Sequence, residues 1–216
     1  MGVYKTEGII LKRIDVGEAD KILTVFSKQR GKISVIAKGV RRVTSRKGGN
    51  LELLYHCVFY LAEGRNLDVL SDVSVIENFD EMRSNLVKIG YAYQIAEVLD
   101  KLTVEDQEAF TVFELLRETL ETLNAATRRY ELILTSFSIK LLSDLGFWSA
   151  NDLKVTPSIK KTLLFLERAS YSNVLRLRLE KRVSEEAVSF IESYVEYVIE
   201  RKLVSKKFVR DIERHV

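Results

Sequence analysis

Residues 3–40 read VYKTEGIILKRIDVGEADKILTVFSKQRGKISVIAKGV and contain three runs rich in Val, Ile, Leu and Phe. Turn-forming residues at 15–17 and 29–31 separate these runs. Two further runs of the same kind follow at residues 51–63 and 66–77. Because no segment between the runs is long enough for a helical crossover, the five strands are predicted to form an antiparallel sheet.

A small sheet of this kind must protect its edge strands from pairing with other chains. Closure into a five-stranded barrel of the oligonucleotide-binding (OB) type removes those edges. Eight of the ten glycines lie between Gly2 and Gly64, as expected for the tight turns and bends of a small barrel. We therefore expect residues 1–79 to form an OB-fold β-barrel.

Beyond residue 79 the apolar residues recur every three or four positions, which indicates helices. A first helix is predicted over residues 82–102, with an apolar face that includes Leu86 and Tyr93. A second helix is predicted to start at Thr103. Its apolar stripe comprises Phe110, Phe113, Leu116, Leu120 and Leu123.

The remaining residues continue the helical pattern. Residues 128–147 are apolar around most of the helical circumference, as expected for the central helix of a bundle. Further helices are predicted over 158–169, after the only proline, over 184–203, and from Ser205 onward. The chain is thus expected to be an α+β two-domain protein with an all-α domain over residues 80–216.

The stretch from Lys21 to Leu51 carries nine Lys and Arg residues and no Asp or Glu. The formal net charge of the whole chain is only +3, so this positive charge is local. An acid-free basic block on a β surface is typical of a phosphate-binding site, although such a run can also be a solvated loop. The predicted nucleic-acid contacts in the block are Lys28, Arg30, Lys32, Lys38, Arg41, Arg42, Arg46 and Lys47.

Barrels of the OB type also hold single strands by stacking bases on aromatic side chains. The aromatic candidates are Tyr4, Phe26, Tyr55, Phe59 and Tyr60. Alternation along the fourth run places Tyr55 and Phe59 on one face and Tyr60 on the other, so one set is expected in the core. We assign only Tyr60 to nucleic-acid binding.

Motifs of catalysis and metal binding are absent from the sequence. Gly31-Lys32 lacks the other residues of a P-loop, and there is no G-x-G-x-x-G, H-E-x-x-H or G-x-S-x-G. Cys57 is the only cysteine, and with His56 and His215 it does not make a metal site, which needs three or four converging ligands. We expect no catalytic residue, no metal, no cofactor and no membrane span, in a protein of the cytoplasm.

The segment YKTEGIILKRIDVGEADKILTVFSKQRGKISVIAKGVRR at residues 4–42 resembles the start of the RecO family of bacterial recombination mediators. The likeness continues in LYHCVFYLAEGRNLDVLSDVSVIENF (54–79), VLRLRL (174–179) and YVEYVIERKLVSKKF (194–208). The resemblance implies an OB barrel followed by a helical domain, without enzymatic activity.

The same resemblance implies a function in recombinational DNA repair near the nucleoid. Proteins of this family bind single- and double-stranded DNA, anneal complementary strands, and act with a RecR partner on DNA coated by single-strand-binding protein so that RecA can load. Many relatives carry a four-cysteine zinc module after the third helix of the second domain. Residues 146–157 contain no cysteine, so we expect that module and its zinc to be absent.

The C-terminal helices carry a second basic set. Its members are Arg201, Lys202, Lys206, Lys207 and Arg210. Cations near a helix C-terminus are favoured by the helix dipole alone. They could also contact DNA, or the acidic tail of single-strand-binding protein, whose apolar last residue and carboxylate require a cation beside an apolar pocket.

Two other functions remain open at this point. An OB barrel with a basic loop can bind RNA in translation or RNA turnover, and preference for RNA would then rest on the 2′-hydroxyl. Alternatively, the chain is a protein-docking adaptor whose positive charge serves solubility only.

Overall fold

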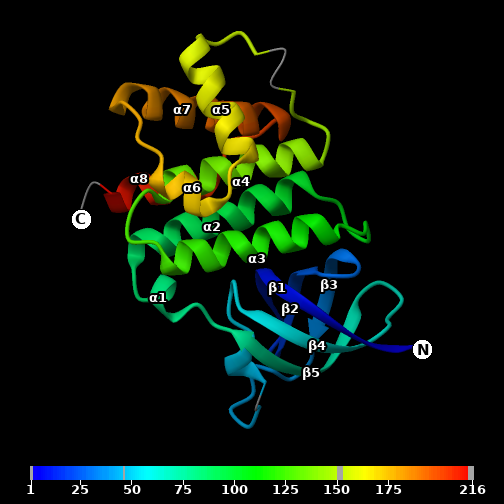
Figure 1. Cartoon of the computed structure of the whole chain (residues 1–216). Helices are drawn as coiled ribbons and strands as arrows, with labels where there is room; N and C mark the ends of the chain where they lie inside the picture. Colours follow the sequence, from blue (N-terminus) through cyan, green and yellow to red (C-terminus); the bar gives the residue numbers. More distant parts are fainter. Residues whose placement is uncertain (1, 46, 150–152, 214–216) are drawn as a thin grey trace. The chain divides into compact units, whose positions relative to one another are not determined.

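The computed structural model describes residues 2–45, 47–149 and 153–213, and it divides into two compact units (Figure 1). The first unit contains the chain up to Phe79 together with Thr103–Arg117. The second contains Asp80–Leu102 and the chain from Glu118 onward. The sequence-based domain boundary at residue 79 therefore separates the barrel strands from the helices, but a segment from the helical half is grouped with the barrel.

The first unit is a closed five-stranded barrel. Its strands are β1 (Val3–Val16), β2 (Asp20–Ser27), β3 (Gly31–Ala37), β4 (His56–Ala62) and β5 (Asp68–Glu77). They are hydrogen-bonded in the order β1-β2-β3-β5-β4, and β4 pairs back onto β1. This topology confirms the expected five-stranded barrel and the α+β class.

The prediction of a purely antiparallel sheet is wrong at one seam. Strands β3 and β5 are parallel, and their register contains only the pairs Val35↔Asp68 and Ile36↔Val69. The reason is geometric, because an odd number of strands in a closed ring cannot alternate in direction all the way round. One neighbouring pair must be parallel, and here it is the pair that closes the barrel between β3 and β5.

The barrel interior is filled by alternate residues of the five strands. Val25, Val35, Cys57 and Phe59 are completely buried there, together with other members of one apolar cluster. Burial raises the pKa of the Cys57 thiol to about 12, so this cysteine is a protonated core residue rather than a nucleophile. This placement agrees with the interpretation of Cys57 as a core residue.

The segment Thr103–Arg117, which we call the strap, lies against the open part of β3. The backbone N–H of Asp106 donates a hydrogen bond of 2.9 Å to the carbonyl oxygen of Lys32, and Glu105 forms a parallel bridge with Lys32. Because β5 pairs only with the second half of β3, the strap supplies backbone partners to the first half. The predicted helix start at Thr103 is wrong for this reason, and α3 (Phe110–Ala125) begins seven residues later.

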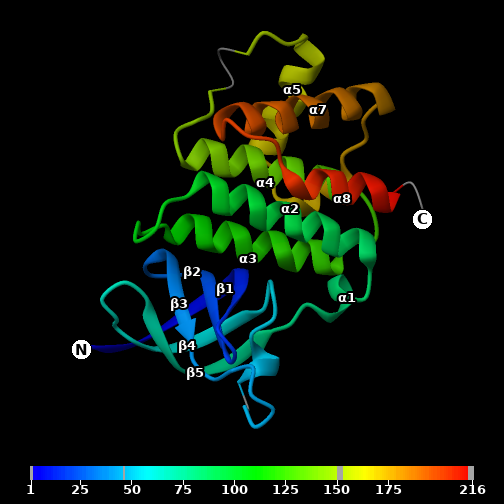
Figure 2. The same ribbon diagram turned by 180° about the vertical axis from the view of Figure 1, so that it is seen from behind.

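The second unit is helical (Figure 2). Besides the second half of α3, its helices are α1 (Asp80–Arg83), α2 (Leu86–Leu102), α4 (Tyr130–Asp144), α5 (Pro157–Arg168), α6 (Tyr171–Arg176), α7 (Lys181–Val198) and α8 (Val204–Glu213). Helix α4 is buried on most of its sides and contacts α2, α5, α6 and α7, which confirms its central position.

Three helix predictions need correction. The helix expected over 82–102 is broken, because the side chain of Asn85 accepts hydrogen bonds from the backbone N–H groups of Val87 and Lys88 and starts α2. Of the predicted apolar face of α2, Ala96, Val98 and Leu99 are buried as expected, whereas Leu86 and Tyr93 are exposed. The short helix α6 has no counterpart among the expected helices, and α7 begins three residues before Ser184.

The contact between barrel and strap can be tested at Gly31. This residue has φ +62°, and a Cβ atom there would overlap the carbonyl oxygen of Gln107 in the strap. Gly17 has φ +55° with open space where a Cβ atom would lie, so it is a matched control. Gly17→Ala should lower the free energy of unfolding by about 1–2 kcal/mol, from backbone strain alone. Gly31→Ala should lower the free energy of unfolding, measured with urea, clearly more than Gly17→Ala does. Equal decreases in the two variants would show that the strap does not contact Gly31.

Candidate nucleic-acid interface

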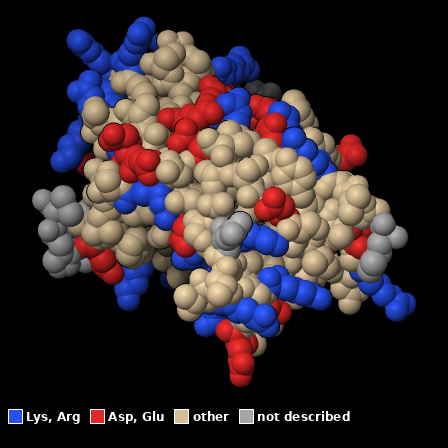
Figure 3. Space-filling view, turned by 90° about the horizontal axis from the view of Figure 1, so that it is seen from below, with Lys and Arg blue, Asp and Glu red and all other residues tan. Residues whose placement is uncertain are grey.

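The described cations of the basic block do not form one surface. The β2–β3 turn holds Lys28 and Arg30, and Lys32 follows at the start of β3. The β3–β4 loop holds Lys38, Arg41, Arg42 and Lys47, and the turn and the loop lie at opposite ends of the barrel (Figures 1 and 2). Figure 3 likewise shows basic and acidic side chains interspersed over the face that it draws. The single basic surface that the sequence predicted is therefore divided between the two ends of the barrel.

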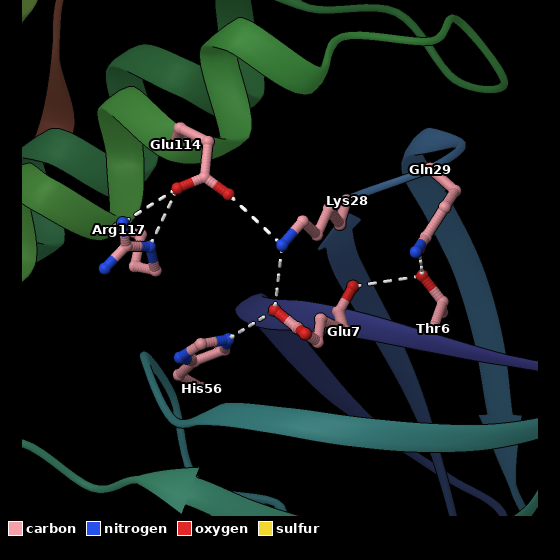
Figure 4. Close-up of polar contacts among 7 residues, drawn as sticks. All are labelled: Thr6, Glu7, Lys28, Gln29, His56, Glu114 and Arg117. Carbon is pink, nitrogen blue, oxygen red and sulfur yellow. Dashed lines mark hydrogen bonds and ion pairs between the residues drawn. The ribbon is translucent and has the colours of Figure 1, made fainter.

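At the turn end, Lys28 lies between two carboxylates (Figure 4). Its Nζ is 3.5 Å from Glu7 of β1 and 3.3 Å from Glu114 of the strap. Arg117 adds a two-pronged contact to Glu114, with distances of 3.0 Å from Nε and 2.8 Å from Nη2. The hydrogen bond from Arg117, with a further contribution from Lys28, holds the pKa of Glu114 below its ordinary value.

His56 belongs to the same network. It is buried, its Nε2 lies 3.6 Å from the Glu7 carboxylate, and its ring meets that of Phe113 edge-on at 5.8 Å between centroids. The hydroxyl of Thr6 donates to Gln29 and ties β1 to the β2–β3 turn (Figure 4). At this end of the barrel, ion pairs within the barrel and between the barrel and the strap neutralise the charged side chains.

The other two cations at this end also have partners within the protein. Arg30 lies 3.7 Å from both Glu63 and Asp68, and its guanidinium sits 4.9 Å from the ring centroid of Tyr4. Lys32 is buried and donates a 2.5 Å hydrogen bond to the carbonyl oxygen of Thr103. Lys28 and Lys32 therefore do not extend an open positive surface, because carboxylates and the strap satisfy these groups. Arg30 is partly exposed and its place in a nucleic-acid interface stays a prediction.

The loop end presents its cations to solvent. Lys38 and Arg42 are exposed, and the described residues give neither of them an ion pair. Arg41 is exposed, donates to the carbonyl oxygen of Gly17 at 3.1 Å and lies 3.4 Å from Asp15. Lys47 donates to the carbonyl oxygen of Ser71 at 2.7 Å. Arg46 lies outside the described residues.

The aromatic candidates separate clearly. Phe26 and Phe59 are fully buried, and Tyr55 packs against the barrel core. Tyr4 donates its hydroxyl hydrogen to Asp68, and burial followed by that hydrogen bond raises its pKa to about 12. Tyr60 is 40% exposed, more than the other four candidates.

Lys5 is a residue that the sequence reasoning missed. Its Nζ lies 5.6 Å from the ring centroid of Tyr60, directly across the β1–β4 pair. The sequence alone could not have found it, because the register of two strands that are about 55 positions apart is set only by closure of the barrel.

The second basic set lies in the helical unit and is partly paired. Lys206 is 2.8 Å from Glu192 and 3.8 Å from Glu196, while Arg210 is 3.6 Å from Glu192. Lys206 and Arg210 line a cavity of about 580 Å³ whose apolar walls include Val188, Leu203 and other side chains of α2, α4, α7 and α8. Lys202 and Lys207 line a shallower hollow beside it, and Arg201 is exposed.

Within the ranges that the structure describes, no group of three or more His, Cys, Asp and Glu side chains is placed to hold a metal ion. In the same ranges, no helix has the length and apolarity needed to cross a bilayer. The segment in which we expect the zinc module to be missing includes residues 150–152, which lie outside the described residues, and the absence of that module stays a prediction.

Two family models match the chain. The model of the N-terminal part of recombination protein O matches residues 1–79, and the model of its C-terminal part matches residues 83–148. The chain belongs to the RecO family.

Several proteins named DNA repair protein RecO are similar to this chain. The protein of Roseiflexus sp. (strain RS-1) is 39% identical over 145 residues, which cover 67% of this chain but only 50% of that relative. The protein of Acetivibrio thermocellus is 27% identical over 248 residues and covers 99% of both chains. Because 248 aligned positions exceed the 216 residues of this chain, that relative contains residues that this chain lacks. The protein of Pelotomaculum thermopropionicum is 28% identical over 243 residues.

The ion pairs of Glu114 with Lys28 and Arg117 predict that Glu114→Gln lowers the stability of the fold in a pH-dependent way. A carboxyl whose pKa is lowered in the folded state stabilises that state above its ordinary pKa, and the contribution disappears as the pH falls through the lowered value. At pH 7 the variant should unfold at a lower urea concentration, by at most about 1 kcal/mol because the pair is partly exposed.

The difference between wild type and Glu114→Gln should vanish toward pH 4 and lower. Glu108→Gln is the matched control, because Glu108 is an exposed residue of the same strap to which the described residues give no ion pair. A constant difference at all pH values would mean that the amide disturbs packing rather than charge.

Proposed function

We propose that this RecO family member binds DNA through the exposed cations of the β3–β4 loop and anneals complementary strands during recombinational repair. The observation that carries the proposal is the set Lys38, Arg41 and Arg42, which is exposed at the end of the barrel opposite the strap contacts. Lys28 and Lys32 are left out of the interface, because Lys28 lies between two carboxylates and Lys32 is buried against the strap. Arg30 keeps a partly exposed guanidinium with ion pairs of 3.7 Å, so it is a secondary candidate at the turn end.

The proposed mechanism is electrostatic. Guanidinium and ammonium groups neutralise phosphates of two strands, release condensed counterions and reduce the repulsion that opposes annealing. Asp15 does not prevent this, because its pair with Arg41 is solvent-exposed and pairs of that kind contribute little free energy. A phosphate group can therefore replace Asp15 at Arg41.

An annealing assay tests this function. Complementary DNA oligomers carrying a fluorescence donor and acceptor are mixed with the chain, both bare and coated with single-strand-binding protein. Acceleration in both conditions supports mediator activity. The proposed setting of that activity is the cytoplasm at the nucleoid, with a RecR-type partner and with RecA loading as the following step. Tighter binding of matched RNA would favour an RNA-binding protein, and no binding at moderate salt would favour a docking adaptor.

The double substitution Arg41→Ala and Arg42→Ala should weaken binding to all DNA sequences by a similar factor. The slope of log Kd against log salt should flatten by about 0.7–0.9 for each phosphate that the variant no longer neutralises. Lys181→Ala with Arg182→Ala is the charge-matched control, because it removes two exposed cations of the helical unit. An unchanged slope in the loop variant would exclude the loop as the phosphate-binding element.

For the helical unit, we propose that the 580 Å³ cavity receives the C-terminal tail of single-strand-binding protein. Its apolar walls suit the last apolar residue of that tail, and Lys206 and Arg210 at its lining suit the carboxylate and the acidic residues. Glu192 holds both cations in the free protein, so the tail must compete with that carboxylate.

Fluorescence anisotropy with a short acidic peptide that ends in a free phenylalanine tests the cavity. Arg210→Ala should weaken peptide binding at least about fivefold, because charged hydrogen bonds contribute about 1.5–3 kcal/mol before the competition with Glu192 is subtracted. Arg201 lies outside the cavity lining, so Arg201→Ala should bind the peptide as tightly as the wild type does. A peptide with an amidated C-terminus that binds as tightly as the free acid would contradict the assignment.

A further inference from the structure

The outer face of β1, β4 and β5 carries one exposed aromatic side chain between two cations. Tyr60 of β4 lies opposite Lys5 of β1 in one register and opposite Asp72 of β5 in the other. The alternation of β4 buries Phe59 and Leu61 and directs Tyr60 outward, where it is 40% exposed. A ring held on the outside of a strand in this way is available for stacking.

Lys5 provides the first cation of this face. Its ammonium lies 5.6 Å from the Tyr60 centroid, within the distance of about 6 Å at which a cation is attracted to an aromatic face. Lys5 is itself exposed, and its long stem lets the ammonium move without any change in the backbone. When a base covers the tyrosine ring, the ammonium can turn to the phosphate of the same nucleotide.

Lys47 provides the second cation, on the other side of Tyr60. This residue comes from the basic β3–β4 loop and donates to the carbonyl oxygen of Ser71, next to Asp72 on β5. Because β4 lies between β1 and β5 in the sheet, the two cations approach Tyr60 from its two neighbouring strands.

The face on which OB domains commonly bind oligonucleotides, over the second and third strands, is obstructed in this chain. Lys32 of β3 is buried against the strap, and the hydroxyl of Ser34 donates to Glu105 of the strap at 2.6 Å. Asp72 is an acid on the remaining face, but one of its oxygens accepts the backbone N–H of Val73 at 2.9 Å. Glu7 is a second acid on this face, two residues from Lys5 on β1, and it is paired with Lys28. The two cations and the aromatic ring therefore outweigh two carboxylates that already have partners.

We propose that the β1–β4–β5 face is a single-strand-specific subsite, in which Tyr60 stacks one unpaired base while Lys5 and Lys47 bind the flanking phosphates. The subsite rests on the DNA binding proposed above and extends it from the loop onto the sheet. Bases of a duplex are already stacked and paired, so they cannot cover Tyr60. The loop cations bind both forms of DNA, and Tyr60 adds affinity for the single strand only.

Anisotropy titrations of full-length Tyr60→Ala with a single-stranded oligomer and with a duplex of the same length test the subsite. Loss of one base–aromatic stack, about 1–3 kcal/mol, should weaken single-strand binding about 5- to 150-fold. Binding to the duplex should change less than twofold. Tyr60→Phe keeps the ring and should retain wild-type affinity for both.

Stacking of a base on Tyr60 can be measured directly with the fluorescent base 2-aminopurine placed in the oligomer. Wild type and Tyr60→Phe should quench its fluorescence, whereas Tyr60→Ala should not. Lys5→Ala should retain quenching but flatten the single-strand salt slope by about 0.7. Tyr60→Phe and Lys5→Ala both keep an aromatic ring at position 60, so they test the subsite even if Tyr60→Ala folds poorly.

Two results would overturn the subsite while leaving the proposed function intact. One is equal weakening of single-strand and duplex binding in Tyr60→Ala, and the other is no weakening of either. Failure of the wild type to bind any DNA at low salt would instead refute the proposed function itself.

Discussion

A closed ring of five strands cannot alternate in direction, and the rest of the first unit depends on this constraint. One neighbouring pair must be parallel, and the β3–β5 pair that takes this place holds only two register pairs. On the side away from β2, the first half of β3 would then lack backbone partners, which is unfavourable for buried polar groups. The strap supplies one at Lys32, so a segment distant in sequence becomes part of the barrel unit.

The strap also determines where positive charge remains available. By placing Glu114 and Glu105 at the turn end of the barrel, it satisfies Lys28 and Ser34, and its backbone satisfies Lys32. The loop end has acids as well, but Glu52 pairs with Arg13 and Asp20 accepts the backbone N–H of Gly39. Asp15 lies beside Arg41 and Lys21, and the described residues give Lys38 and Arg42 no ion pair. The same chain therefore has one neutralised end and one end whose cations can meet phosphates.

Much of the fold could be predicted from local sequence. The five β runs, the apolar circumference of α4 and the proline at the start of α5 each reflect local preferences of a few residues. Errors occurred where a distant partner overrode the local pattern. Thr103 and the residues after it follow a helical pattern, but Glu105 instead forms a backbone bridge with Lys32 of β3. Leu86 and Tyr93 satisfy the helical period but lie outside the face that the helical unit buries.

The sequence by itself determined the class of the protein, namely a β-barrel and a helical domain of the RecO family, together with the location of its excess cations in the first third. These features depend on composition and short-range periodicity, which need no knowledge of contacts. Only the tertiary structure decided which cations are satisfied, that Tyr60 faces outward beside Lys5, and that Lys206 and Arg210 line a cavity. The reason is that strand register, ion pairing and cavities arise between residues far apart in the chain, and their distances are set only when the barrel closes and the helices pack.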